Sequence, residues 1–311
     1  MAEPRDPARF ERTATGRWAS HAAAAVSWLV HGDPPDALAH ALAHAGSLAP
    51  QLSPPDPRAV DGIKEGTPWA VVAGLMAARL ARARVPGPLY LLERDTAYRP
   101  GDLDRITARH PGAVTQTYFK RYACCRWIHP VLDCLLDMYP GLPLAPDELA
   151  RIDAIEVVTF ERSLRLTNRP DPRTLEEAHY SFPFCVALAL TAGADALLPI
   201  HPEALRRSAT VDLARRVHLA TDPAHDAAFP ARTPATVRVH TAGRTRERSA
   251  PTARGDPGLP LGAEALRHKH RRLTARHGPA VAATLARLLD PDAPVDVHDL
   301  TDTIFCPQEE R

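Results

Sequence analysis

Residues 152–166 read IDAIEVVTFERSLRL, and this stretch sets the fold class expected for the middle of the chain. Ile155, Val157 and Thr159 occupy alternate positions, with Glu156 between the first two. Alternation with a period of two, in a segment rich in β-branched and aromatic residues, is typical of a strand. The stretch therefore predicts a strand with one buried face.

Other segments around this strand extend the mixed pattern. Residues 114–122 have a similar β-branched and aromatic composition, which predicts a second strand. Residues 236–249 predict a β-hairpin that turns at Ala242-Gly243. Residues 129–139 and 181–192 are spaced as amphipathic helices. The middle of the chain is therefore expected to combine a sheet with helices.

The two flanks of the chain are helical in pattern. Residues 19–30 form one expected helix, and His31-Gly32-Asp33-Pro34-Pro35 ends it as a turn. Asp36 is expected to cap the next helix, which continues to about Leu48. At the other end, helices are predicted for residues 262–277 and 279–289.

This order predicts an α+β fold in which a mostly helical large domain carries a smaller inserted domain. Residues 1–114 form the first part of the helical domain, which we expect to be incomplete at its N-terminus. Residues 115–250 form the α+β domain. Residues 251–311 return to the helical domain.

A third helix of the first flank is expected to begin at Thr67-Pro68, because a capping residue followed by proline is a common helix start. Its large apolar residues are expected to face inward, and arginines near its end suit the helix dipole. The residues expected inside are Val71, Val72, Leu75, Met76 and Leu80.

Composition excludes several classes of function. The 38 basic and 37 acidic residues leave a formal net charge of +1, so bulk charge attracts neither nucleic acid nor an anionic membrane. The longest apolar stretch, residues 69–80, is too short to span a bilayer, and no signal segment is visible at the N-terminus. The 5 cysteines have no regular spacing. We therefore expect a cytoplasmic protein with reduced thiols.

Lysine is rare in this arginine-rich chain: only Lys64, Lys120 and Lys269 occur. A lysine kept in such a background is a candidate for chemistry. His268 to Arg272 form a basic cluster on a predicted helix, which we interpret as a solvated face rather than a phosphate site. His40 and His44 are four residues apart, but without a third ligand we expect ordinary helix histidines rather than a metal site.

Residues 120–130, KRYACCRWIHP, gather a lysine, two arginines, two thiols and a histidine where a strand is expected to meet a helix. Guanidinium groups match carboxylates, so Arg121 and Arg126 are candidate substrate-binding residues, and Lys120 adds a point charge. His129 has the side chain suited to move a proton near neutral pH. The alternative is that this segment is a polar surface loop in which the histidine caps the helix.

This segment resembles the KPYPCCRYTHP-type motif of the MmgE/PrpD family, which includes 2-methylcitrate dehydratase, cis-aconitate decarboxylase and iminodisuccinate epimerase. Residues 179–184, HYSFPF, followed by CVALAL, are similar to a second family segment, F-S-x-x-Y-x-x-A-x-A-L. Residues 254–257, RGDP, with Pro260-Leu261, resemble its K-G-D-P-x-x-P-L turn. The order and spacing of the three segments also fit.

The resemblance implies a helical domain carrying a smaller α+β domain, with the active site in the cleft between them. It implies lyase or isomerase chemistry without a cofactor on small polycarboxylates: a base removes a proton next to a carboxylate, and water or CO2 leaves. Lys120 and His129 match motif positions that line the cleft. Cys125 falls where some members have histidine and others cysteine.

The chain also departs from the family pattern. Family members are longer at the front, and Glu11 stands where the family has a catalytic histidine. In the loop before Thr67, Asp61 takes the place of a family lysine and Lys64 that of a histidine. The catalytic set implied here is therefore Lys120, His129, Lys64 and Cys125, with Arg121, Arg126, Asp61 and Glu11 near the substrate. No metal is implied.

Two readings of function remain open from the sequence. The first is a dehydratase acting on a small polycarboxylate such as 2-methylcitrate, or a diverged eliminating enzyme of specialised metabolism. The second is a catalytically impaired or half-site subunit. A short front end predicts association, either as a homodimer or with a chain that supplies the missing helices. A misassigned start codon is a third explanation of the short front.

Overall fold

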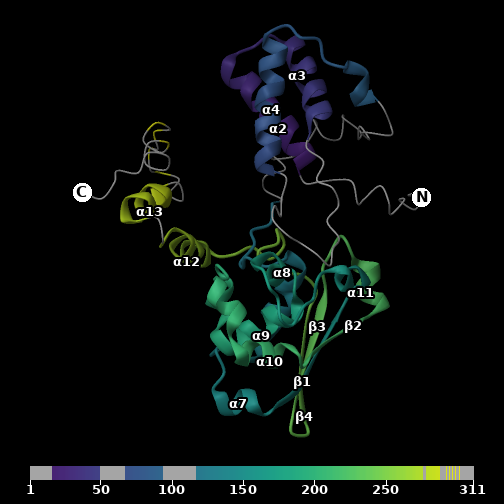
Figure 1. Ribbon diagram of the computed structural model, residues 1–311, viewed down its shortest axis with the longest axis vertical. Coiled ribbons are helices and arrows are strands. Elements are labelled where there is room, and N and C mark those ends of the chain that lie inside the picture. Colours follow the sequence, from purple (N-terminus) through teal and green to yellow (C-terminus); the bar gives the residue numbers. More distant parts are fainter. Residues whose placement is uncertain are drawn as a thin grey trace. The chain divides into compact units, whose positions relative to one another are not determined.

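The computed structural model describes residues 16–49, 67–93, 117–275 and 278–287, with residues 292, 294, 296, 298 and 301. The chain divides into two compact units, residues 1–111 and 112–311 (Figure 1). Helices and a four-stranded mixed sheet together confirm the predicted α+β class. None of the helices in these ranges is long and apolar enough to cross a membrane.

The first unit packs three helices side by side (Figure 1): α2 (Gly16–His31), α3 (Pro35–Leu48) and α4 (Thr67–Arg82). A short 3₁₀ helix, η1 (Leu89–Glu93), follows. The helix positions agree with the sequence, but the cap of α3 was predicted wrongly. Pro34 is its N-cap residue and no side chain caps it, while Asp36 lies inside the first turn.

The face of α4 was also predicted wrongly. Its buried residues are small, and they meet a core of alanines that includes Ala24, Ala41 and Ala45. A Cβ on Gly74 would lie 2.2 Å from the carbonyl oxygen of Ser20 in α2, so only glycine permits this close approach. The large apolar residues Val71, Val72, Leu75 and Met76 are exposed, and Leu80 is half-buried.

The histidines of α3 join it to the segment after α4. His44 is buried, and its Nε2 lies 3.0 Å from the carbonyl oxygen of Val85. The backbone N–H of Gly87 donates to Nδ1 of His40 over 3.0 Å. Among the described residues no group of three metal-ligating side chains is found. Both rings thus contact the segment after α4, and His44 is more buried than expected.

The second unit is built on a sheet with strand order β2-β1-β3-β4. β1 (Ile152–Thr159) pairs in parallel with β2 (Val217–Thr221) and antiparallel with β3 (Ala235–Thr241). β3 and β4 (Arg244–Ala250) form the predicted hairpin, with Ala242 and Gly243 at positive φ in its turn. β4 is an edge strand whose side chains are mostly exposed and charged, which protects the edge.

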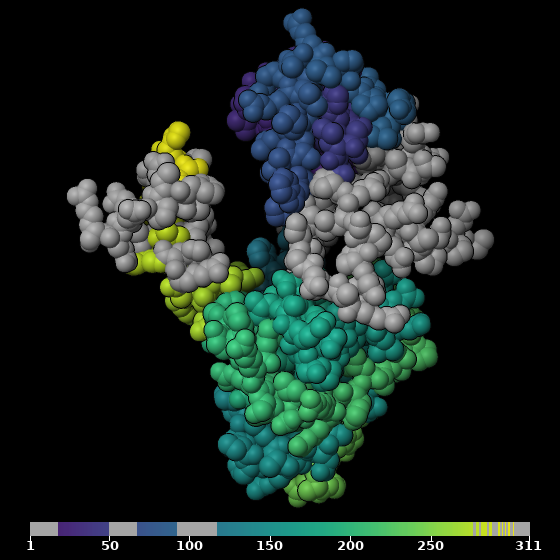
Figure 2. All heavy atoms as spheres, viewed as in Figure 1, coloured from purple at the N-terminus to yellow at the C-terminus, as the bar shows by residue number. Residues whose placement is uncertain are grey.

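The core of this unit lies between the sheet and two helices, α6 (His129–Met138) and α9 (Phe182–Ala192). Every side chain from Phe182 to Leu190 is buried, so α9 is an interior helix and not the amphipathic helix expected. The hydroxyl of Ser181 accepts from the backbone N–H of Phe184 and caps α9. In Figure 2 the teal and green residues of this unit form one continuous surface.

Shorter elements complete the second unit. These are the α-helices α7 (Pro146–Ala150), α8 (Leu175–His179), α10 (Ser208–Ala214) and α11 (Pro223–Ala228), and the 3₁₀ helices η3 (Arg126–Ile128), η4 (Glu161–Arg165), η5 (Ala194–Leu197) and η6 (Pro202–Arg206). The chain then forms α12 (Ala263–Thr274) and α13 (Gly278–Arg287). The expected first strand is wrong over residues 117–122, which have no regular structure, and the strand from Ile152 ends at Thr159.

Candidate active site

The segment of residues 117–130 runs without regular structure into η3 and then into α6. It therefore lies before a helix, as predicted, but not after a strand. Pro130 occupies the first turn of α6, where its missing N–H leaves no hydrogen bond unmade. His129 begins the helix and is 1% exposed.

A turn near the end of the sheet holds this segment in place. The backbone N–H of Phe119 donates to the carbonyl oxygen of Gly255 over 2.8 Å. The Arg126 guanidinium makes a two-pronged contact with Asp256, with Nε to Oδ1 at 3.0 Å and Nη2 to Oδ2 at 2.5 Å. The Thr252 hydroxyl also contacts Asp256 Oδ2. We call these contacts between residues 117–130 and 252–256 the motif clasp.

Gly255 is required at the centre of the motif clasp. Its φ of +103° lies in a region that residues with a Cβ rarely adopt. A Cβ at this position would also lie 2.0 Å from the carbonyl oxygen of Phe119. The glycine of the RGDP turn therefore has two physical reasons, backbone conformation and the close approach of the opposite segment.

Arg254 connects the same turn to α6. Its backbone N–H donates to Asp133 Oδ2 over 2.7 Å, and its Nη2 lies 2.5 Å from Asp137 Oδ1. Asp133 is 4% exposed. Burial raises the pKa of the Asp133 carboxyl, against the opposing effects of Arg254 and of the charges of His129 and Arg121. Both arginines of the clasp, Arg126 and Arg254, thus have carboxylate partners.

Residues 179–184, which also resemble a family segment, contact the segment of residues 117–130. The backbone N–H of Cys125 donates to the carbonyl oxygen of His179 over 2.7 Å. The next turn contributes as well, because Ala123 N–H donates to the carbonyl oxygen of Leu197 over 3.0 Å. The three stretches singled out in the sequence are therefore adjacent in the folded unit.

His129 lies in a buried polar cluster beneath Tyr122. Its Nε2 is 3.4 Å from the carbonyl oxygen of Cys124, and the two aromatic rings meet edge to face at 5.4 Å. Burial opposes ionisation of the Cys124 thiol, but hydrogen bonding with Cys185 and the hydrogen bond and charge of His129 lower its pKa well below the ordinary value. Burial raises the pKa of Tyr122, whose buried hydroxyl has no hydrogen-bond partner among the described residues.

The other thiols are ordinary in this structure. Among the described cysteines, Cys124, Cys125, Cys134 and Cys185 form no disulfide, so the adjacent pair is not bonded. Cys125 is half-buried, and burial raises the pKa of Cys134 to about 12.

Lys120 and Arg121 are half-buried. The Lys120 ammonium donates to the carbonyl oxygen of Ala123 over 3.3 Å, and the Arg121 guanidinium lies 5.4 Å from the Tyr122 ring centroid. No carboxylate of the described residues forms an ion pair with either cation. Arg126 differs, because its guanidinium already forms an ion pair with Asp256. That Arg126 binds substrate stays a prediction, and it requires this ion pair to break.

The solvated face expected for the basic cluster of α12 is wrong in part. Lys269 is half-buried, and its ammonium donates to the carbonyl oxygen of Lys120 over 2.6 Å. His268 contacts Asp195, and Arg272 donates to the carbonyl oxygens of Leu198 and Asp195. Arg271, which pairs with Glu264, and Arg272 are exposed, as expected of a solvated face.

The structure therefore groups Lys120, Arg121, Cys125, Arg126 and His129 within one segment. The other predicted site residues, Glu11, Asp61 and Lys64, lie outside the described residues.

Two residues of this region, Asp133 and Asp256, were not predicted from the sequence, and Lys269 was assigned to a solvated face. Asp133 could have been found as a charged residue on the apolar face of a predicted helix. Asp256 stands in the quoted RGDP turn.

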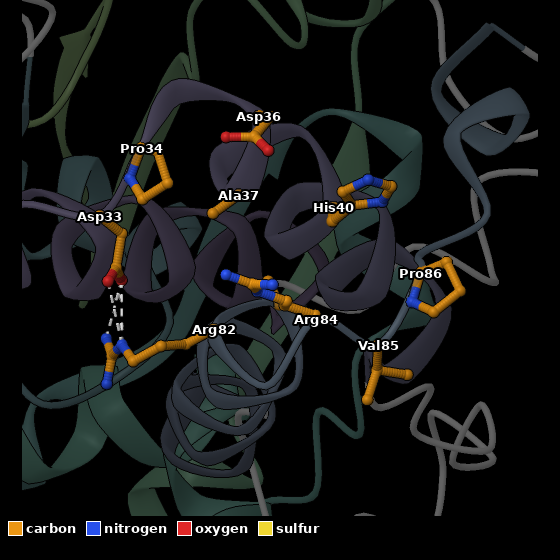
Figure 3. Close-up of a pocket in the computed structure, with 10 residues that line it drawn as sticks. Asp33, Pro34, Asp36, Ala37, His40, Arg82, Arg84, Val85 and Pro86 are labelled. Carbon is orange, nitrogen blue, oxygen red and sulfur yellow. Dashed lines mark hydrogen bonds and ion pairs between the residues drawn. The ribbon is translucent and has the colours of Figure 1, made fainter.

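A separate hollow of about 520 Å³ lies in the first unit, between the start of α3 and the end of α4 (Figure 3). Asp33 and Arg82 form an ion pair at its side, over 2.9 Å. Arg84 also lines it, at a φ of +60°. None of the predicted site residues that the structure describes lines this hollow.

The comparison with protein families agrees with the convergence of the three segments. The model of the MmgE/PrpD C-terminal domain matches residues 122–290, more than half of the chain. The chain belongs to the MmgE/PrpD family. The match contains Cys124, Cys125, His129 and the RGDP turn, while Lys120 and Arg121 directly precede it. No curated protein matches the chain. For this MmgE/PrpD protein, the clasp thus joins two segments that carry the family resemblance.

Proposed function

We propose that this MmgE/PrpD protein is a hydro-lyase that acts on a small polycarboxylate such as 2-methylcitrate. The observation that carries the proposal is which cations around the motif clasp have a carboxylate partner and which do not. Lys120 and Arg121 are half-buried and lack a carboxylate partner among the described residues, whereas Arg126 and Arg254 have one. Half-buried cations without an acid are suited to bind the carboxylates of a ligand.

The proposed reaction is an elimination. A base removes the proton on the carbon next to a carboxylate, the electron pair forms the C=C bond, and the hydroxyl on the neighbouring carbon leaves as water after it gains a proton. Lys120 and Arg121 would hold the carboxylate and stabilise the charge that develops on it. His129 is the proposed proton carrier, and because it is buried beneath Tyr122, we expect it to reach substrate only when the Tyr122 ring moves.

The first prediction concerns turnover. Purified chain incubated with 2-methylcitrate, citrate or cis-aconitate is expected to change the absorbance of the enoate. Lys120→Met is expected to lower kcat/KM by roughly 100-fold or more, because it removes a charge that acts in the transition state. His129→Gln is expected to lower kcat by roughly 100- to 10,000-fold, as for loss of a general acid–base group.

Arg215→Met is the matched control, since Arg215 is exposed and pairs only with Asp212 on α10. It is expected to turn over substrate as the unaltered chain does. A chain that converts none of the three acids, or a Lys120→Met variant with unchanged kcat/KM, would contradict the proposal.

A second candidate is a subunit that functions only in association with another chain, and the exposed residues of the first unit favour it. Trp18, Leu29 and Val30 of α2 are 65%, 69% and 75% exposed, and Trp69 of α4 is 60% exposed. Such large apolar side chains mark surfaces that associate. We expect light scattering after size exclusion to give a dimer mass at micromolar concentration. If the chain remains a folded monomer across the concentration range, this would argue against a homodimer and against a half-site subunit that completes its site with a second copy.

A further inference from the structure

The strongest unexplained feature outside the predicted site is Lys269 on α12. Its ammonium lies 2.6 Å from the backbone carbonyl oxygen of Lys120, and its side chain is half-buried. The contact brings together two of the three lysines of the chain from positions 149 residues apart. A carbonyl oxygen accepts a hydrogen bond but carries no full negative charge, so this contact does not neutralise Lys269.

Lys269 differs from its neighbours on α12 in the partners of its side chain. His268 contacts Asp195, Arg267 and Arg271 contact Glu264, and Arg272 caps carbonyl oxygens. No carboxylate of the described residues lies within ion-pair distance of Lys269 or of Lys120. Burial and the charge of Lys120 lower the pKa of Lys269, which is the effect expected of a cation without a counter-ion.

The charge of Lys120 disfavours the charged form of Lys269, which is unfavourable for the folded chain alone. An anion that contacts both would reverse this effect, and each ammonium has three donors of which one is used here. We infer that Lys269 is a further substrate-binding cation, and that Lys120 and Lys269 together bind the carboxylates of one polycarboxylate ligand. This inference rests on the proposed function for the identity of the ligand class.

The scarcity of lysine gives a direct test. Chain expressed with lysine carrying ¹³C at the ε carbon has three lysine side chains to observe, and single Lys→Arg variants assign them. Citrate is the probe and acetate the control with one carboxylate. On titration with citrate, the Lys120 and Lys269 signals are expected to shift with one common Kd. Acetate at the same concentration is expected to shift them much less.

The pH dependence of the Lys269 signal adds a second readout. Free chain is expected to show Lys269 titrating below the ordinary lysine range, because burial and Lys120 disfavour its charged form. Bound citrate favours the charged form, so it is expected to raise the pKa of Lys269. A Lys269 signal that neither shifts nor changes its titration with citrate, while the chain is folded, would overturn the inference.

Variants test the same point by affinity. Lys269→Met is expected to weaken citrate binding by roughly 10- to 100-fold, as for loss of a charge-assisted hydrogen bond, and to raise KM more than it lowers kcat. Lys269→Arg keeps the charge and is expected to retain most of the affinity. Arg267→Met removes an exposed cation from the same helix and is expected to bind citrate normally.

The outcomes separate this inference from the proposed reaction. Citrate that binds to both lysines without turnover of any acid would refute the hydro-lyase and support the lysine pair. Turnover with an unchanged KM in Lys269→Met would refute the lysine pair and leave the hydro-lyase standing. If Lys269→Met does not fold, Lys269→Arg and the signals of the unaltered chain still decide.

Discussion

Arg126→Met is expected to lower the free energy of unfolding of the second unit by about 3 kcal/mol. The Arg126 and Asp256 side chains are 18% and 10% exposed, so water screens their ion pair only weakly. Without Arg126 the carboxylate stays buried with the Thr252 hydroxyl as its remaining side-chain partner. A buried charge left without its partner destabilises the folded chain by far more than the intact ion pair stabilises it.

A double-mutant cycle isolates this effect. Asp256→Asn removes the charge, so Arg126→Met combined with Asp256→Asn is expected to be more stable than Arg126→Met alone. Unfolding in urea, followed by hydrogen exchange of peptides from the interior helix α9, measures the second unit separately from the first. Equal stabilities of Arg126→Met and the unaltered chain would mean that the motif clasp contributes nothing to folding.

Gly255→Ala is expected to destabilise the second unit by about 3 kcal/mol or more. The added methyl group would meet a backbone carbonyl oxygen at 2.0 Å, which no side-chain rotation relieves. Alanine is also strained at a φ of +103°. The chain can accommodate the methyl group only by moving Phe119 and the turn apart, which breaks their hydrogen bond.

The same turn offers a matched control. A Cβ on Gly258 would meet no heavy atom within 4 Å, so Gly258→Ala is expected to leave stability within about 0.5 kcal/mol. Midpoints of urea unfolding of the two variants give the comparison. Similar midpoints for Gly255→Ala and Gly258→Ala would show that the close approach to Phe119 is not maintained in solution.

Local patterns predicted the parts of the fold that depend on neighbours in the sequence. The hairpin around Ala242-Gly243 and the start of α9 after Ser181 are correct because turn chemistry and capping act within a few residues. The strand expected over residues 114–122 is wrong over residues 117–122, because the backbone N–H of Phe119 pairs with Gly255 instead of with a neighbouring strand.

The face of α4 shows a different limit. Hydrophobicity favours burial of Val72 and Leu75, but α2 approaches α4 so closely at Gly74 that the buried face of α4 consists of alanine and glycine. Close packing of small residues thus outweighed the size of the apolar side chains. Whether Ala70 or Val72 faces a neighbouring helix depends on an interhelical distance that no local pattern contains.

The candidate site was predictable as a segment but not as a network. Residues 120–130 stood out by their chemistry, and the RGDP turn by its resemblance. The sequence could not show that Asp256 neutralises Arg126, or that Lys269 lies on the carbonyl group of Lys120, because these partners are 130 and 149 residues apart. Charge partners at such separations follow from topology alone.

The motif clasp also determines when the second unit can complete its folding during synthesis. A ribosome makes the chain from the N-terminus, so Arg126 emerges 130 residues before the aspartate that neutralises it. Gly255, which receives the N–H of Phe119, is equally late. A nascent chain that ends at the hairpin contains the strands of the sheet, but its Arg126 still lacks the Asp256 partner. The unit therefore closes only after residues 252–256 have left the ribosome.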